Sequence, residues 1–242
     1  MTTVTIEDLT PDSADAGVAA HYGDPMREQR LLETAVGLVD RSNRDVVAVP
    51  GEERASWLHT LTTQHLTDLR AGQASELLVL SPHGHVEQHA FVTEDGTTAW
   101  LDTEPGAGAG LLKYLETMRF FTRVEPRDAS AEMAVYSLVG PGAADVIGGL
   151  DEPRRVPVPG AKFAAGSVPP EPTALYAVRD LDGVLARRVP LGVDLLVPRG
   201  RKLDLDVPRA GLWAYEAIRV AHRIPRLGGE TDHRTIPAEA EL

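Results

Sequence analysis

The sequence predicts an α+β fold built from two related halves. Short apolar runs typical of strands are interleaved with amphipathic helical segments, and the turn signals between neighbouring strands are those of hairpins. Frequent hairpins favour a mixed sheet over a doubly wound parallel one. A strand followed by a helix is expected at 45–61 (DVVAVPGEERASWLHTL) and again at 133–150 (MAVYSLVGPGAADVIGGL). This internal echo predicts that the two halves have related structures.

The chain begins with an acidic segment that precedes the first regular element. Residues 1–24 lack the basic and apolar regions of a signal peptide, and they predict a disordered leader. The next segment, 26–42 (MREQRLLETAVGLVDRS), places Leu31, Ala35 and Leu38 at helical spacing. We therefore expect the first helix there.

The other elements of the first half are each indicated by a local pattern. The apolar run at 45–49 is typical of a strand, and a helix with two glutamates in its first turn follows, where the helix dipole favours acids. Asp95-Gly96 stands between two strand-like segments and is a strong hairpin signal. In chain order we expect a helix at 52–61, strands at 74–80, 88–94 and 97–103, a helix that opens at the glycine-rich 105–110, and a strand at 121–127.

The second half repeats this alternation after a long connection. The strand and helix of 133–150 lead into residues 151–172, which are rich in proline and glycine and predict a long irregular connection. Three strands and a final helix follow, at 174–179, 183–189 and 192–198 and from near Arg209 to about Arg223.

Composition excludes several classes of function. The chain has 24 basic and 36 acidic side chains, a net charge of −12, so counterion release does not favour a nucleic-acid partner. It holds no apolar run long enough to cross a membrane. The absence of cysteine excludes disulfides, thiolate metal ligands and a thiol nucleophile within these residues. We expect a cytoplasmic protein.

The final helix divides into an apolar arc and a polar ridge. At roughly 100° per residue, Tyr215, Arg219 and His222 share one ridge. A guanidinium forks carboxylates and stacks on rings, so this ridge could meet an anionic planar ligand, although a solvated surface is the alternative. The arc expected to face the core consists of Trp213, Ala214, Ala217, Ile218, Val220 and Ala221.

Asp194 is a carboxylate in the apolar strand of 192–198. Alternation puts it with Leu196 on one face of the strand, opposite a face of valine and leucine. A buried carboxylate needs donors, because leaving it unpaired costs several kcal/mol. Asp194 could accept paired N–H groups from a heterocycle such as a pterin, or it could pair with Arg187 or Arg188.

Two further patterns only weakly indicate a metal site and a dinucleotide-binding loop. The turn of His83 and His85, with His89 after it, offers imidazoles, but a Pro-His-Gly-His turn is typically solvated, so we predict no metal site. The glycines of 106–110 precede a helix, but their spacing differs from a dinucleotide-binding loop and no ribose-binding acid follows.

Four segments together resemble the glycine-cleavage T-protein superfamily of aminomethyltransferases (GcvT-like), and in particular its YgfZ-type folate-binding branch. Each motif is weak, but their order and spacing are specific, and they extend over nearly the whole chain. The segments are RDVVAVPGEERASWLHTLTTQHLTDLRAG (44–72), ELLVLSPHGHVEQHAFV (76–92), LLKYLETMRFFTRVEPRD (111–128) and AIRVAHRIPRLGGETDHRTIP (217–237).

The resemblance implies a domain organisation. It implies a GcvT/YgfZ-like folate-binding fold with two related α+β halves of the ferredoxin-like kind. Residues 25–47 and 133–242 would form the central folate-binding domain, and 48–132 an inserted α+β domain. The C-terminal β-barrel domain of the family is expected to be absent from this chain.

The resemblance also implies a ligand and the residues that hold it. The ligand would be tetrahydrofolate or one of its one-carbon derivatives. Asp194 falls where aminomethyltransferases carry a glutamate that holds the pterin, and Arg219 matches the arginine of their L-R-x-E-x-G helix. Tyr215, Gln64 and Glu230 complete the implied folate-binding set.

Three departures from the family pattern bear on activity. Aminomethyltransferases place a catalytic aspartate after the glycine turn, where 87–89 read Glu-Gln-His, so Glu87 would have to replace it. Their R-T-G-Y-T-G-E loop is reduced to RRVPLG at 187–192. Ala221 and Arg223 replace the glutamate and glycine that follow the helix arginine.

These features lead to one principal hypothesis and two alternatives. The RIPRLGGETDHRTIP segment resembles the YgfZ branch, which implies tetrahydrofolate binding in iron–sulfur cluster assembly or repair, with iron–sulfur proteins as partners. The branch's K-G-C-Y-x-G-Q-E motif does not occur in this chain. The alternatives are a folate-dependent aminomethyl or methyl transferase that uses Glu87, and a non-catalytic scaffold that has lost folate binding.

Overall fold

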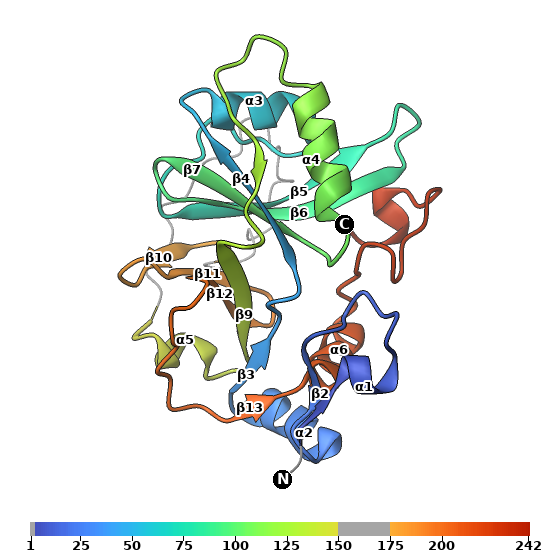
Figure 1. Cartoon of the computed structure of the whole chain (residues 1–242), viewed down its shortest axis with the longest axis vertical. Helices are drawn as coiled ribbons and strands as arrows, with labels where there is room; N and C mark the ends of the chain where they lie inside the picture. The colour runs from blue at the N-terminus through green and yellow to red at the C-terminus, as the bar shows by residue number, and fades with distance from the viewer. Residues whose placement is uncertain (1–2, 150–174) are drawn as a thin grey trace, which may run out of the picture.

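Two larger β-sheets organise the molecule, as Figure 1 shows. The computed structural model describes residues 3–149 and 175–242. One sheet has five antiparallel strands in the order β5-β6-β7-β4-β8, and the other has six in the order β10-β11-β12-β9-β3-β13. The first consists of β4 (Asp45–Pro50), β5 (Gln73–Leu80), β6 (Val86–Glu94), β7 (Thr98–Thr103) and β8 (Arg127–Asp128). The second consists of β3 (Gly37–Asp40), β9 (Met133–Val139), β10 (Val178–Asp180), β11 (Leu185–Val189), β12 (Gly192–Pro198) and β13 (Arg209–Ala210).

The helices of the described residues are α1 (Ile6–Leu9), α2 (Pro25–Thr34), α3 (Arg54–Leu61), α4 (Gly108–Thr117), α5 (Ala143–Val146), α6 (Leu212–Ala221) and the 3-10 turn η1 (Pro237–Glu239). Helices α2 to α6 pack on the faces of these sheets. In the part of the chain that is described, each helix is too short or too polar to cross a bilayer.

One face of the five-stranded sheet is covered by α3 and α4. Leu58 of α3 and Leu111 and Leu115 of α4 are fully buried against alternate strand residues. Burial of each such side chain stabilises the fold by about 1.5–3 kcal/mol. The indole of Trp57 adds a hydrogen bond to the carbonyl of Met118 at 3.1 Å.

The six-stranded sheet has an apolar layer on each face. Val39 of β3 and Val139 of β9 pack with α2 and α6, whereas the preceding residues, Leu38 and Leu138, pack on the other face with α5. Because side chains alternate along a strand, the two layers come from neighbouring positions. The sheet is therefore covered on both sides around these strands.

The two sheets meet along a smaller apolar cluster. Leu196 of β12 packs there with Val46 and Ala48 of β4. Val193 and its alternate neighbours lie in the layer on the opposite face, so the alternation predicted for this strand is confirmed. Asp194 shares the face of Leu196 and points between the sheets.

The predicted hairpin at Asp95-Gly96 is confirmed. Strands β6 and β7 pair in antiparallel register, with Glu94 opposite Ala99. Gly96 has φ +101°, a left-handed conformation that glycine adopts without steric cost. The Asp95 carboxylate accepts hydrogen bonds from the turn's N–H groups and from the Trp100 indole at 2.7 Å.

The helix predicted within 26–42 is α2, and it ends earlier than predicted. It begins after the N-cap Asp24, whose side chain accepts the N–H of Arg27 at 3.0 Å, and it ends at Thr34. Residues 37–40, predicted to be helical, form β3 and pair with β9. The position of Leu38 fits the spacing of a helix, but a short apolar run fits a strand equally well, so the periodicity did not distinguish the two.

The predicted disordered leader is also corrected. Within residues 3–24, β1 (Val4–Thr5) pairs with β2 (Ala19–His21), and α1 lies between them. Ile6, Val18 and Ala20 are buried in the core beside α6. Burial of these three apolar side chains stabilises the ordered segment. The prediction of disorder was based on the acidic composition and did not take this burial into account.

Three smaller predictions differ from the structure or lie outside it. The strand expected at 121–127 is reduced to β8, because 121–126 are irregular and only Arg127 and Asp128 pair with β4. The expected boundary between residues 47 and 48 falls inside β4, which belongs wholly to the five-stranded sheet. The connection of 151–172 lies outside the described residues.

Gly211 fixes the entry into α6. Its N–H donates to the carboxylate of the buried Glu28 at 2.8 Å. A Cβ atom there would lie 2.2 Å from the carbonyl oxygen of Ala20, which is backbone and cannot rotate away. The close approach of β2 to α6 therefore requires glycine.

We predict that Gly211→Ala lowers the free energy of unfolding by about 1–3 kcal/mol, because the added methyl group must push β2 away from α6. Urea unfolding followed by circular dichroism measures this. The matched control is Gly142→Ala, where an added Cβ makes ordinary contacts at 3.6 Å, and where we expect a change within about 0.5 kcal/mol. Equal effects of the two substitutions would contradict the steric explanation.

Candidate functional site

A small cavity, lined by both charged and apolar residues, lies between the two sheets and is bordered by α6 and the segment that follows it. Its volume is about 40 Å³, which leaves room for only a few water molecules. The walls come from β6, β9, β12, α6 and the turn between β11 and β12. They consist of Arg41, His89, Phe91, Glu104, Ser137, Leu138, Val139, Val189, Pro190, Leu191, Asp194, Tyr215, Arg219, Ile224, Pro225 and Arg226.

Asp194 lies on the wall of this cavity and is 2% exposed. Its Oδ1 accepts a hydrogen bond from the hydroxyl of Ser137 at 2.6 Å, and its Oδ2 accepts one from Nη2 of Arg187 at 2.9 Å. Arg41 lies 3.7 Å from Oδ1. Of the partners that the sequence left open, Arg187 is the observed one, and the pairing leaves the carboxylate at the cavity wall.

Arg187 joins the two sheets. Its side chain is wholly buried on β11, and Nη1 donates to Oδ1 of Asp102 on β7 at 2.6 Å and to Thr93 on β6 at 3.0 Å. The guanidinium also lies 4.8 Å from the ring centroid of Phe91. Its Nε has no hydrogen-bond partner among the residues that the structure describes. One arginine thus holds Asp102 and Asp194 from opposite sheets.

Two arginines of the β3–β4 connection extend the ion pairs. Arg44 donates to Asp102 through Nε at 3.1 Å and pairs with Glu104 through Nη1. Arg41 lies 3.8 Å from Glu104, and its guanidinium stacks 4.4 Å from the ring centroid of Tyr215. Positive charge is therefore fixed on both sides of the acidic end of β7.

Arg219 of α6 is held by carboxylates on its own side of the cavity. It pairs with Glu216 at 2.5 Å and with Glu230 at 2.9 Å. Nη1 also donates to the carbonyl of Ile224 at 3.1 Å. These contacts orient the guanidinium and tie the segment after α6 to the helix.

Arg226 closes the cavity from the segment after α6. It donates to Glu104 at 2.7 Å and to Glu216 at 3.1 Å. It also pairs with Asp15 of the N-terminal segment at 2.9 Å. One side chain thus connects the N-terminal segment, the end of β7 and α6.

Charge and burial shift the ionisation of the network in opposite directions. Burial alone would raise the pKa of Asp102, but the charges of Arg187 and Arg44 outweigh it and hold that pKa below its usual value. The pKa of Glu104 is lowered in the same way, against burial, by Arg44 and its neighbouring arginines. Burial raises the pKa of Tyr215. Asp102 and Glu104 are therefore ionised and the Tyr215 hydroxyl is neutral at pH 7.

Four of the residues singled out from the sequence lie together. Asp194, Tyr215 and Arg219 line the cavity. Glu230 does not line it but binds Arg219 and accepts the N–H of Arg226 at 2.8 Å.

The polar ridge predicted for α6 is partly the buried face of the helix. Tyr215 and Arg219 are buried, whereas Trp213 and Val220, which were expected in the core, are 45% and 58% exposed. His222 is exposed as predicted for a ridge residue. The buried face differs from the apolar arc because the surface beneath α6 is itself charged, and arginine gains more there than an apolar side chain does.

Gln64 and Glu87 lie elsewhere. Gln64 is exposed in the loop after α3, where its backbone carbonyl oxygen lies within hydrogen-bond distance of the His59 ring. Glu87 is exposed and borders a separate hollow with His85 and His233. Among the described residues no three His, Cys, Asp or Glu side chains are arranged to hold a metal ion.

Several cavity residues were missed from the sequence. Arg41 and Arg44 stand in a polar turn after β3 and read as solvated charges, and Ser137 is a small residue in an apolar strand. Glu104 follows β7 and precedes a Pro-Gly turn, which also suggests a surface. The alternation of β7 could have placed Asp102 on the face opposite the apolar Leu101, but it does not identify a partner.

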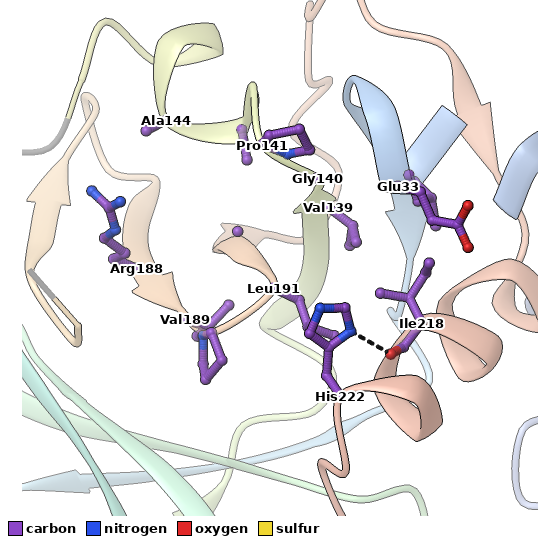
Figure 2. A pocket seen from close by; sticks show the side chains of 14 residues that line it. Glu33, Val139, Gly140, Pro141, Ala144, Arg188, Val189, Leu191, Ile218 and His222 are labelled. Atoms are coloured by element: carbon purple, nitrogen blue, oxygen red, sulfur yellow. Dashed lines mark hydrogen bonds between the residues drawn. The ribbon is translucent and has the colours of Figure 1, made fainter. Parts of the chain in front are cut away.

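A larger hollow adjoins the cavity, and Figure 2 shows its lining. Its volume is about 260 Å³. The turn between β11 and β12 separates the two spaces, because Val189, Pro190 and Leu191, together with Val139, line both. His222 reaches into the hollow and bonds through Nδ1 to the carbonyl of Ile218 at 2.9 Å (Figure 2).

The arrangement is that of a two-sheet α+β protein with a small cavity between the sheets, and a strand carboxylate and a helix arginine lie on the wall of this cavity. The family described as GCVT N-terminal domain matches residues 20–166, more than half of the chain. The chain belongs to this family. The predicted α+β fold and membership of the aminomethyltransferase superfamily are thereby confirmed.

Individual relatives agree with this membership. The aminomethyltransferase of Thermus thermophilus is 27% identical over 223 residues, covering 89% of this chain and 62% of that protein. A putative chloroplastic transferase of Arabidopsis thaliana is 23% identical over 141 residues, covering 57% of this chain and 32% of that protein. Among solved structures, the glycine cleavage system aminomethyltransferase T from Bartonella henselae shares the fold, with a TM-score of 0.74, 18% identity and 93% and 62% of the two chains covered.

We predict that Asp102→Asn lowers the free energy of unfolding at pH 7 by about 3–5 kcal/mol, because it leaves Arg187 and Arg44 buried without their shared counter-charge. Urea unfolding measures the difference. Glu132→Gln is the control, because Glu132 pairs with Arg127 at the surface and should change stability by less than about 1 kcal/mol.

The deficit of Asp102→Asn should also depend on pH. The pKa of Asp102 is lower in the folded chain than in the unfolded one, so its stabilising contribution is complete above about pH 5 and is lost as the pH falls below about 4. The gap between wild type and variant should therefore narrow on acidification. A gap that is constant or widens would show that Asp102 does not act through its charge.

Proposed function

We propose that this chain binds a reduced folate in the cavity between its sheets, within a protein that performs folate-dependent one-carbon transfer. The observation that carries the proposal is the presence of Asp194 and Arg219 on the wall of one enclosed cavity in a member of this family. The chain spans 62% of the length of the aminomethyltransferase from Thermus thermophilus, so the activity of a whole protein is part of the proposal.

The free acceptor positions of Asp194 support binding of a pterin. An ionised carboxylate offers about four acceptor positions, and Asp194 accepts one hydrogen bond from Ser137 and one from Arg187. The N–H groups of a pterin ring are paired donors, which suit the positions that are left. Ser137 and Arg187 hold this acceptor in a fixed orientation, so little entropy is lost on binding.

The other candidate residues support the acidic end of a folate. Arg219 would bind a carboxylate or stack on a ring, and Glu230 would hold Arg219 in place. Tyr215 would act through its ring and its neutral hydroxyl. Gln64, which is exposed in the loop after α3, would contribute only if that loop moved toward the ligand.

The size of the cavity sets a condition on this proposal. Small-molecule sites commonly measure about 300–1,000 Å³, far above the roughly 40 Å³ observed. The neighbouring hollow of about 260 Å³ lies behind the turn that carries Pro190 and Leu191. Movement of this turn would join the two spaces, so we propose that it is the wall that opens.

The relatives support transfer chemistry over the iron–sulfur role. The relatives named above include aminomethyltransferases, whereas assembly or repair of iron–sulfur proteins was implied by resemblance to the YgfZ branch alone and stays a prediction. In a transferase Glu87 was expected to replace the missing aspartate. Its exposed position supports such a role only if the β5–β6 turn approaches the ligand.

The ion pairs within the cavity wall favour a second candidate function. Arg187, Arg41 and Arg219 already satisfy much of the charge around Asp194 and its neighbours. A protein that retained the family fold and lost folate binding would have such a closed, internally neutralised site. Fold alone does not distinguish the two functions, but ligand binding does.

Isothermal titration of the full chain with tetrahydrofolate tests the proposal. We expect binding, and we expect Asp194→Ala and Arg219→Ala each to weaken it by about tenfold or more, since a charge-assisted hydrogen bond contributes about 1.5–3 kcal/mol. Arg223→Ala is the matched control for the helix arginine, because Arg223 is exposed and pairs only with Glu241 among the described residues.

Circular dichroism would first establish that each variant is folded. Absence of heat with the folded wild-type chain would favour the scaffold. Binding that is unchanged in both Asp194→Ala and Arg219→Ala would refute the proposed site.

We predict that Leu191→Ala raises the affinity for tetrahydrofolate by roughly threefold or more, because a thinner partition lowers the free energy needed to open the site. The same titration measures it. Leu69→Ala removes a comparable, partly buried leucine from the distant core and should leave affinity unchanged. Unchanged or weaker binding in Leu191→Ala would show that the turn is not the wall that opens.

A further inference from the structure

His89 is an imidazole in the wall of the cavity that the proposed function has not used. It lies on β6, is 6% exposed and borders the same cavity as Asp194. Its Nε2 lies 2.7 Å from Oε1 of Glu76 on the neighbouring strand β5. The two residues are diagonal neighbours across the strands, since Glu76 pairs with Phe91.

Glu76 is held in turn by Tyr176. The hydroxyl of Tyr176 donates to the other oxygen of Glu76, Oε2, at 2.8 Å. Tyr176 has φ +65°, a left-handed conformation that is rare for a bulky side chain. Its backbone is fixed there by hydrogen bonds with Arg188 and Ala74, each at 2.9 Å. Both oxygens of Glu76 are thus occupied by donors.

These contacts determine where His89 holds its proton. Burial raises the pKa of Glu76, but the hydrogen bonds from His89 and Tyr176 outweigh burial and leave that pKa below its usual value. Glu76 is therefore ionised and can only accept, so Nε2 of His89 must be the donor. The neutral ring then has its lone pair on Nδ1. No hydrogen bond from Nδ1 to another described residue occurs.

The charged groups around His89 come from every element that faces it. Glu76 lies on β5, and Arg187 stacks on Phe91, whose ring centroid is 5.4 Å from that of His89. The remaining charged residues of the cavity wall are Arg41, Glu104, Asp194, Arg219 and Arg226. Each of these is engaged in an ion pair, whereas the ring nitrogen Nδ1 is not.

We propose that His89 exchanges a proton at Nδ1 with a nitrogen of the heterocycle bound in this cavity, and that Glu76 and Tyr176 are positioning residues for it. This inference deepens the proposed function and takes the identity of the ligand from it. Glu87, two residues earlier, points to a different hollow.

The chemistry required of His89 is a reversible proton transfer. With a proton on both nitrogens the ring is an imidazolium, paired with Glu76 through Nε2. It donates the proton at Nδ1 to a ligand nitrogen and becomes neutral, and it recovers a proton from the ligand or from water.

Long-range proton–nitrogen NMR of the full chain labelled with ¹⁵N-histidine tests this. Spectra recorded at about pH 8.5, above the range in which histidine ordinarily titrates, should show His89 with Nε2 protonated and Nδ1 unprotonated. His89→Gln assigns the signals. Addition of tetrahydrofolate should shift the Nδ1 resonance of His89 more than the resonances of His83, an exposed internal control.

Two variants separate positioning from structure. Glu76→Ala should abolish the preference for the Nε2-protonated form, whereas Tyr176→Phe, which keeps the carboxylate, should retain it. If Glu76→Ala does not fold, the wild-type and Tyr176→Phe spectra still decide the tautomer.

Two results would overturn the inference. One is a His89 ring protonated on Nδ1 in the ligand-free wild-type chain. The other is tetrahydrofolate binding, seen as heat, that leaves the Nδ1 resonance of His89 unmoved. Absence of heat with tetrahydrofolate would instead refute the proposed function, and the ligand-free tautomer would still decide where His89 holds its proton.

Discussion

The ion pair between Arg187 and Asp102 is the contact on which the site depends. It joins β11 of one sheet to β7 of the other, and both side chains are wholly inaccessible to water. The same guanidinium holds Asp194, and Arg44 approaches Asp102 from the opposite side. Because an unpaired buried charge costs several kcal/mol, these groups are tolerated only if the sheets meet in one register.

Stability alone does not account for so many charges between two sheets. A buried ion pair loses most of its attraction to desolvation, and a packed apolar layer often stabilises a protein as well or better. The neighbouring contact of Leu196 with Val46 shows that apolar packing is possible there. The ionic part provides fixed hydrogen-bond donors and acceptors, which apolar packing does not. Such an arrangement suits the polar heterocycle that we propose as the ligand, and His89 is the group that we propose to exchange a proton with it.

Local patterns predicted much of the fold, and they failed where the environment of an element overrides them. The hairpin at Asp95-Gly96 and the alternation around Asp194 depend on neighbouring residues, so both were predictable. The strand at 37–40 and the ordered segment at 3–24 were not, because their stability comes from pairing with β9 and from packing beside α6. The prediction of which face of α6 is buried was partly wrong for a related reason, because the helix packs on charged residues and buries Arg219.

By itself the sequence determined the class of fold, the family through the order of four weak motifs, and the need of Asp194 for a donor. Only the tertiary structure decided that this donor is Arg187, that Asp102 shares it from 85 residues away, and that His89 rather than Glu87 faces the cavity. The physical reason is that periodicity orients a side chain relative to its own strand or helix. The partner of that side chain depends on which distant strand faces it across the interface, and this is decided by the packing of the two sheets.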